Sequence, residues 1–263
     1  WQDAAGDLDY FVMKRFLPAK YVNLCFILRN NVTARHKKRA PRLDLWAWEF
    51  IQDQEEFLQS LFDRAFTRED RRRYDYFAMQ TFRKQYSLKV RDPSYDEKFK
   101  RKNEGVPFEL PEHVFMREAM ETARQEIESR HESVEALQTA LDRVQITFEA
   151  LSEHLYTHAS PTMFNSCTPR NQTASCFLFK IAHDSITGIY TTLKLGAEVS
   201  QCGGGLGICV QNVRCTGSEI SSGGVSNGII PMLRNYNDMV TYVSQGSNRR
   251  GSGAIMVAIW NKD

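Results

Sequence analysis

The chain has 263 residues, of which 42% are hydrophobic and 25% charged, values typical of soluble globular proteins with a hydrophobic core. Its 34 basic and 32 acidic residues give a net charge of only +2, which argues against a field that attracts nucleic acid or a membrane surface. No window approaches the roughly 18 apolar residues of a membrane span, and residues 1–9 do not form a signal peptide, so we expect a cytoplasmic protein.

Two local features narrow the class further. The six cysteines form no CxxC pair and have no histidine at ligand spacing, so the sequence predicts neither a metal site nor a secreted disulfide framework. We expect most of them to be reduced thiols in the core. The basic clusters 37–39 and 71–73 lack interleaved aromatic residues, and nucleic-acid binding is therefore not expected.

Residues 1–158 have helical periodicity and predict a helical N-terminal domain. A first apolar stripe runs through Trp46, Phe50, Phe57, Leu61 and Phe66. Residues 84–111 mix charged residues with Gly and Pro, and predict a surface connection. Ser129 and Glu132 then form a candidate capping box before the clearest helix. Its stripe, with alternating steps of four and three, consists of Leu137, Leu141, Val144, Phe148, Leu151 and Leu155.

From residue 159 on, short apolar runs alternate with helical stretches and predict an α/β domain that extends to residue 263. Strands are predicted at 176–181 and 206–213. Helices are predicted after Asp184, which we interpret as an N-cap, and at 229–243. A last apolar run at 254–260 predicts a buried strand. Because the sequence begins without Met and stops just after this run, we expect a fragment of a longer chain.

Four segments of this half suit an anionic ligand. Four glycines among residues 203–207 allow close approach of a backbone, although a tight turn into the strand explains them equally well. They match neither the dinucleotide fingerprint nor the P-loop. Asp184 at a helix start could bind a ribose hydroxyl or act as an ordinary cap. The loops 214–227 and 244–253 are rich in Gly, Ser and Asn around a few arginines, which suits a polyanion or a surface turn.

Short motifs follow one another in a fixed order from residue 157 on. They are THASPTMFN at 157–165, ASCFL at 174–178, DSI at 184–186, GIY at 188–190, the glycine run, RCTGS at 214–218, SNG at 226–228, PMLR at 231–234 and QG at 245–246. Such an ordered series is far more specific than any one motif. In this order the motifs resemble the large, catalytic subunit of class I ribonucleotide reductases, ribonucleoside-diphosphate reductases.

The resemblance implies a fold and a reaction. The helical domain, 1–158, would precede the first strands and helices of a ten-stranded α/β barrel, 159–263. The enzyme would reduce ribonucleoside diphosphates to deoxyribonucleotides. A thiyl radical removes the 3′ hydrogen, the 2′ hydroxyl leaves as water, and two cysteine thiols supply two electrons as they form a disulfide. The radical cysteine and the second redox cysteine would lie downstream, so we expect the fragment alone to be inactive.

The resemblance also implies partners. This chain would bind no cofactor of its own, and a metal-containing small (β) subunit would supply the radical. The large subunit would form a homodimer, with thioredoxin or glutaredoxin as its reductant. Nucleoside triphosphates, namely ATP, dATP, dTTP and dGTP, would act as allosteric effectors.

Substrate residues follow from the matching positions. Cys176 matches one cysteine of the redox pair, although a strand cysteine is often simply a small core residue. Ser160 and Ser175 match positions that bind the substrate. The backbone at Gly205 matches the place where the diphosphate nucleotide approaches. Arg250 matches the basic end of the loop that couples effector identity to substrate choice.

Effector residues are carried over in the same way. The segment that holds the deoxyribose is matched by Asp184, Ser185 and Ile186, and the arginine that binds the phosphates is matched by Arg214. The loop that covers the effector is matched by Ile220, Ser221 and Ser222. Gln245 matches the loop between the effector and substrate sites. Gln201 and Cys202 stand where many relatives have Lys or Arg, so we expect the effector preference to differ.

Two alternatives remain open. A cobalamin-dependent class II reductase shares the barrel and the cysteine pair, and a requirement for cobalamin would indicate it. A non-catalytic relative would bind nucleotides or partner proteins without reducing anything. Loss of the radical cysteine in the downstream sequence would indicate that second alternative.

Overall fold

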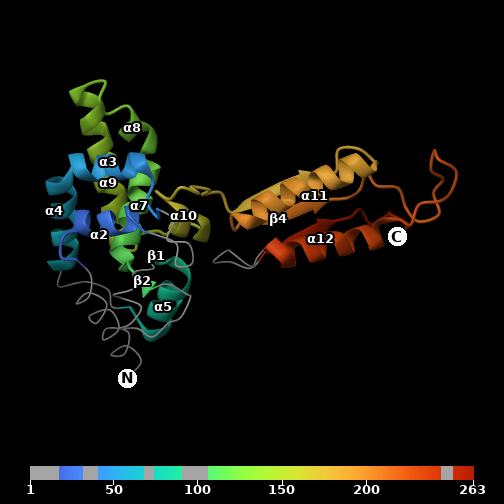
Figure 1. Cartoon of the computed structure of the whole chain (residues 1–263), viewed down its shortest axis with the longest axis horizontal. Helices are drawn as coiled ribbons and strands as arrows, with labels where there is room; N and C mark the ends of the chain where they lie inside the picture. The colour runs from blue at the N-terminus through green and yellow to red at the C-terminus, as the bar shows by residue number, and fades with distance from the viewer. Residues whose placement is uncertain (1–17, 32–40, 68–73, 91–105, 244–250) are drawn as a thin grey trace. The chain divides into compact units, whose positions relative to one another are not determined.

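A computed structural model of the chain describes residues 18–31, 41–67, 74–90, 106–243 and 251–263 (Figure 1). The chain divides into two compact units, Trp1–Thr173 and Ala174–Asp263. The first unit includes α10 (Ser160–Asn165), whereas the texture of the sequence already changes near residue 158. No helix of the described ranges combines the length and the apolar character needed to cross a bilayer.

The first unit is helical. Besides α10 it contains α2 (Tyr21–Arg29), α3 (Leu45–Asp53), α4 (Glu55–Thr67), α5 (Tyr76–Thr81), the π-helix η1 (Phe82–Tyr86), α7 (Pro111–Thr122), α8 (Arg124–Glu128) and α9 (Val134–Ser152). A short antiparallel ladder joins β1 (Lys89–Val90) to β2 (Val106–Pro107). The predicted helical domain is confirmed.

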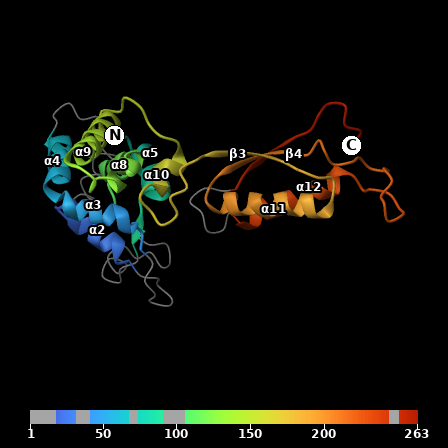
Figure 2. The ribbon, with the colours of Figure 1, turned by 90° about the horizontal axis from the view of Figure 1, so that it is seen from above.

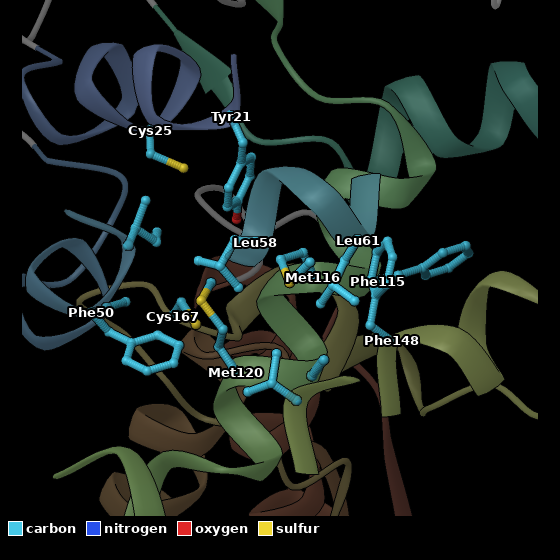
Figure 3. Packing of buried hydrophobic residues seen from close by; sticks show 14 of the residues in the cluster. Tyr21, Cys25, Phe50, Leu58, Leu61, Phe115, Met116, Met120, Phe148 and Cys167 are labelled. Atoms are coloured by element: carbon cyan, nitrogen blue, oxygen red, sulfur yellow. The ribbon is translucent and has the colours of Figure 1, made fainter. Parts of the chain in front are cut away.

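Helix α9 is the clearest predicted helix and packs along α7. Its face of Val144, Phe148 and Leu151 is buried, which stabilises the unit by about 1.5–3 kcal/mol for each large side chain. Phe148, Met116 and Met120 lie together in the core of this unit (Figure 3). The predicted capping box is wrong, because Ser133 is the N-cap and accepts a hydrogen bond from the Ala136 amide at 3.0 Å.

Three further predictions for this unit need correction. The stripe from Trp46 to Phe66 belongs to two helices, α3 and α4, because the chain turns at Gln54. Leu155 lies beyond α9 and is exposed. The segment 84–111 is not merely a surface connection, since Phe108, Glu109 and Leu110 at its end are fully buried. Residues 91–105 within it lie outside the described residues.

The second unit is a three-stranded parallel sheet in the order β3 (Cys176–Lys180), β4 (Gly205–Cys209), β5 (Gly253–Met256). Helices α11 (Ile186–Gln201) and α12 (Ile229–Val243) cover one face of it (Figure 2). Leu206 and Ile208 point from β4 into the core beneath them, where Met232 and Tyr236 also lie. Strand–helix–strand crossovers of this kind begin an α/β barrel, and the predicted fold class is confirmed.

Helix α12 has the predicted bounds, but the last strand differs from its prediction. The strand ends at Met256, and all four of its residues are exposed rather than buried. The reason is its position, because β5 pairs only with β4 and forms the edge of the described sheet. The 206–213 prediction also runs too far, since β4 ends at Cys209 and residues 211–213 form a turn.

Candidate functional site

The first candidate residues meet where β3 and β4 begin. Cys176 is the register partner of Gly205, and the Gly205 amide donates to the carbonyl of Ser175 at 2.8 Å. The Ser175 hydroxyl donates to the Cys176 sulfur at 3.6 Å. Since alternate residues of a strand face opposite ways and Phe179 packs into the core beneath the helices, Cys176 lies on the uncovered face of the sheet. Three sequence-predicted residues therefore form one cluster.

Cys176 is exposed, and this excludes the alternative of a core thiol in the second unit. On its face of the sheet the neighbouring position is Gly205, which has no side chain. A β-carbon added there would lie 3.4 Å from the Ser175 carbonyl oxygen. The glycine thus leaves both the sulfur and the adjacent main-chain groups open to a ligand.

The other cysteines differ in their environment, and the prediction that most are core thiols is wrong. All six lie in the described residues and none of them forms a disulfide there, but only Cys25 and Cys167, both in the helical unit, are fully buried (Figure 3). Burial raises the pKa of both thiols well above the ordinary value, so they stay protonated and unreactive. Cys202, Cys209 and Cys215 are half-buried.

Ser160 begins α10 in the first unit, and its hydroxyl lies 3.1 Å from the hydroxyl of Tyr86. Tyr86 is the last residue of the π-helix η1, which packs against α10. A π turn holds an extra residue and is frequent at functional sites. The sequence analysis did not identify Tyr86, because a π turn leaves no periodic signal in the sequence.

A buried ion pair holds both partners of this contact. Arg117 donates to the two carboxylate oxygens of Glu109 at 2.7 and 3.0 Å, and neither side chain is more than 1% exposed. Glu109 also accepts from the amide of Leu88, two residues after Tyr86. The remaining N–H groups of the guanidinium donate to two main-chain carbonyls, that of Met163 in α10 and that of Ser166 at its C-cap. The pair thus fixes η1 and α10 to α7.

A second buried acid lies beside the strand-free segment before α10. Glu118 of α7 is fully buried, and its Oε2 lies 2.7 Å from Nδ1 of His158. The other carboxylate oxygen has no hydrogen-bond partner among the described residues. His158 is two residues before Ser160, so this contact holds the chain that leads into α10. It was also missed by the sequence analysis, because the two residues are distant in sequence.

The predicted effector residues lie beyond the C-terminal end of β3. Ser185, rather than Asp184, is the N-cap of α11 and accepts from the Gly188 amide at 3.1 Å, so the predicted cap is wrong by one residue. Asp184 instead pairs with Arg214, whose Nε lies 2.5 Å from Oδ2 of the carboxylate. Ile186 starts the helix and is exposed. The structure thus brings Asp184, Ser185, Ile186 and Arg214 together.

The loop after Arg214 is a hairpin of residues 216–228. Its strands are joined by main-chain hydrogen bonds from Ser226 to Ser218 at 2.8 Å and from Gly217 to Ser226 at 2.9 Å. Arg214 donates through Nη1 to the carbonyl of Glu219 at 2.8 Å, which ties the hairpin to the Asp184 pair. The exposed tip contains the predicted residues Ile220, Ser221 and Ser222.

The Cys176 cluster and the Asp184 cluster lie at opposite ends of the strands. Cys176 and Gly205 are the first residues of their strands, whereas Asp184 and Arg214 follow the last ones. Five residues of strand separate these two ends by roughly 16 Å. Gln245 and Arg250, predicted in the loop that couples effector and substrate, are outside the described residues.

Comparison with known proteins agrees with the division of the chain into two units, Trp1–Thr173 and Ala174–Asp263. The family model described as ribonucleotide reductase, all-alpha domain, matches residues 95–171, and that described as ribonucleotide reductase, barrel domain, matches residues 174–263. The ribonucleoside-diphosphate reductase large chain of Schizosaccharomyces pombe is 35% identical over 240 residues, which are 90% of this chain and 26% of that protein.

Two further relatives carry similar names. The ribonucleoside-diphosphate reductase large subunit of vaccinia virus is 37% identical over 90% of this chain and 27% of its own length. That of Arabidopsis thaliana is 40% identical over 77% of this chain and 21% of its own length. The chain therefore spans about a quarter of the length of the curated relatives that it matches.

Proposed function

Because the chain belongs to the ribonucleotide reductase large-subunit family, we propose that it is part of an enzyme that reduces ribonucleoside diphosphates to deoxyribonucleotides. The observation that carries the proposal is the exposed thiol of Cys176, beside Ser175 and Gly205, at the start of two parallel strands. The names of the relatives, which specify a large chain and a diphosphate, favour class I over the cobalamin-dependent alternative.

In this proposal Cys176 is one of two thiols that reduce the ribose. After a thiyl radical removes the 3′ hydrogen, the 2′ hydroxyl leaves as water and the thiols give up two protons and two electrons to become a disulfide. The hydrogen bond from the Ser175 hydroxyl to the Cys176 sulfur, at 3.6 Å, holds the two side chains together beside the proposed substrate. Thioredoxin or glutaredoxin would then reduce the disulfide.

Substrate binding is proposed for Ser160, Ser175 and the backbone at Gly205. Hydroxyl and amide groups neutralise a phosphate by hydrogen bonds and keep a bulky cation away from the radical. Tyr86 supports this role, because its hydroxyl shares a hydrogen bond with that of Ser160 at 3.1 Å and thereby orients the serine. Arg250 is proposed as a further substrate contact.

Regulation by nucleotides is proposed at the C-terminal ends of β3 and β4. The N-terminus of α11 with Asp184, Ser185 and Ile186 would bind the deoxyribose of ATP, dATP, dTTP or dGTP, and Arg214 would bind the phosphates. Ile220, Ser221 and Ser222 at the hairpin tip would cover the nucleotide. Gln245 would couple this site to the substrate, which is allostery through one short segment.

The partners follow from the same proposal. A metal-containing small subunit would supply the radical, and the cytoplasm would provide the reducing environment that thiol chemistry needs. A homodimer of large subunits is supported by exposed apolar side chains on the two helices of the second unit. They are Ile186, Tyr190 and Leu195 on α11 and Ile230 and Tyr242 on α12.

The proposal is tested with the full-length large subunit, a small subunit and ribonucleoside diphosphates under multiple turnover. Wild type should turn over, and Cys176→Ser should lose turnover because one thiol of the pair is missing. Cys209→Ser is the matched control, since Cys209 lies on the same face of the sheet and should tolerate the change. Normal turnover of Cys176→Ser would contradict the assignment. An inactive wild type with every effector would favour the non-catalytic alternative.

A further inference from the structure

One carboxylate holds both ends of the effector hairpin. The Oδ1 atom of Asp263 accepts a hydrogen bond from the amide of Thr216 at 2.7 Å, and its Oδ2 atom accepts one from the amide of Ile229 at 2.8 Å. Thr216 begins the hairpin, and Ile229 is the first residue of α12. The Thr216 hydroxyl also donates to the carbonyl of Asn227 at 3.1 Å. The base of the hairpin is therefore closed around a single side chain.

A carboxylate suits this position. It offers one acceptor to each amide, and its negative charge is favourable at the N-terminus of α12. The hydrogen bonds from the Ile229 and Thr216 amides accordingly lower the pKa of Asp263 below its ordinary value. Between the two amides the chain passes through Gly228 at φ +72°, a conformation that favours glycine.

This clamp, formed by the Asp263 carboxylate and the amides of Thr216 and Ile229, is connected to the sheet by further hydrogen bonds. The amide of Ala258 donates to the side chain of Gln211 at 2.9 Å, just after β4. The amide of Asn261 then donates to the carbonyl of Ala258, and the Asn261 side chain accepts from the amide of Asp263 at 2.9 Å. The position of the Asp263 carboxylate is thus set by the segment that follows β5, and the hairpin is held relative to β4.

We infer that Asp263 is a positioning residue that fixes the base of the hairpin and thereby sets the affinity of the neighbouring site for nucleoside triphosphates. The inference rests on the proposed effector site. A fixed base keeps the carbonyl of Glu219 against Arg214, so the covering tip is already in place before a nucleotide binds. Without the clamp, binding would have to order the hairpin, and affinity would fall.

The variant Asp263→Asn tests this in the full-length large subunit, with dTTP and dATP as probes in equilibrium binding. An amide has one acceptor, and its NH2 group would face a second N–H donor, so we expect binding about tenfold weaker. The sign is informative. Loss of a negative charge near a triphosphate would by itself strengthen binding, and a weaker binding therefore reports the lost geometry.

Two companion variants complete the design. Glu219→Gln removes the same charge within the hairpin but leaves the main-chain contacts intact, so its affinity should be unchanged or higher. Asp263→Glu keeps both acceptors on a longer arm and should recover part of the lost affinity. At saturating effector, Asp263→Asn should reach wild-type turnover, because the clamp acts on effector binding and not on the reduction.

The outcomes separate the inference from the function on which it rests. If wild type binds triphosphates and Asp263→Asn binds them equally well, the clamp is refuted and the effector site stands. If wild type binds none, the effector site fails and the clamp with it. In Asp263→Asn, hydrogen exchange should accelerate at residues 216–228 and not in the rest of the second unit. Faster exchange throughout β3 and β4 would assign Asp263 a general role in folding and overturn the inference.

Discussion

Replacement of Arg117 by methionine tests the network that holds the Tyr86–Ser160 contact. The change leaves the Glu109 carboxylate fully buried with one remaining hydrogen bond, from the Leu88 amide. It also removes the donors to the Ser166 and Met163 carbonyls. Removal of one partner from a buried ion pair lowers the free energy of unfolding by about 3–5 kcal/mol. We expect a loss of this size for Arg117→Met.

The double variant Glu109→Leu, Arg117→Met sharpens the test. It removes both charges, so the remaining loss comes from the orphaned Leu88 amide and the α10 carbonyls, at about 1–3 kcal/mol for each group left unsatisfied. The double variant should therefore be less destabilised than the sum of the two single variants, with a coupling energy of about 2–3 kcal/mol.

Tryptophan fluorescence during urea unfolding of the chain provides the assay. Trp46 and Trp48 pack against the core of the helical unit, whereas Trp260 is 76% exposed and should respond little. The signal therefore follows the unit that contains the pair. Additive losses in the two single variants, or a loss below about 1 kcal/mol for Arg117→Met, would refute the reasoning.

Two further predictions concern Tyr86 in the first unit and Gly188 in the second. Tyr86→Phe removes the hydroxyl that lies 3.1 Å from that of Ser160 and should raise the KM for a nucleoside diphosphate about 2–10-fold in steady-state assays of the full-length enzyme. Tyr76→Phe, on the exposed face of α5, should leave the KM unchanged. An unchanged KM in Tyr86→Phe would contradict the role of Tyr86. Gly188→Ala places a β-carbon against the main-chain carbonyl oxygen of His183 and should destabilise the start of α11 by about 1–3 kcal/mol in hydrogen exchange. Gly196→Ala, whose nearest atoms lie at 3.4 Å in flexible side chains, should be neutral or stabilising. Equal exchange in the two variants would contradict the argument.

The sequence determined the elements that depend on local patterns. The stripe of Val144, Phe148 and Leu151 requires a helix with one buried face, since these positions align only at a period near 3.6 residues. The bounds of α12 and the alternation of strands and helices in the second unit also followed from local patterns. The ordered motifs from residue 157 on also identified the family, because their sequence reflects a shared site and not a propensity.

Only the tertiary structure decided how distant groups meet. Asp184 lies at a helix start, and its sequence fits an N-cap, but Arg214 lies thirty residues away and competes for the carboxylate. Tyr86 meets Ser160, and Glu109 meets Arg117, through packing that no local pattern encodes. Asp263 becomes a clamp because β5 runs parallel to β4 and returns the chain to the start of α12. Long-range pairings of this kind depend on where the backbone lies, and sequence periodicity contains no information about that.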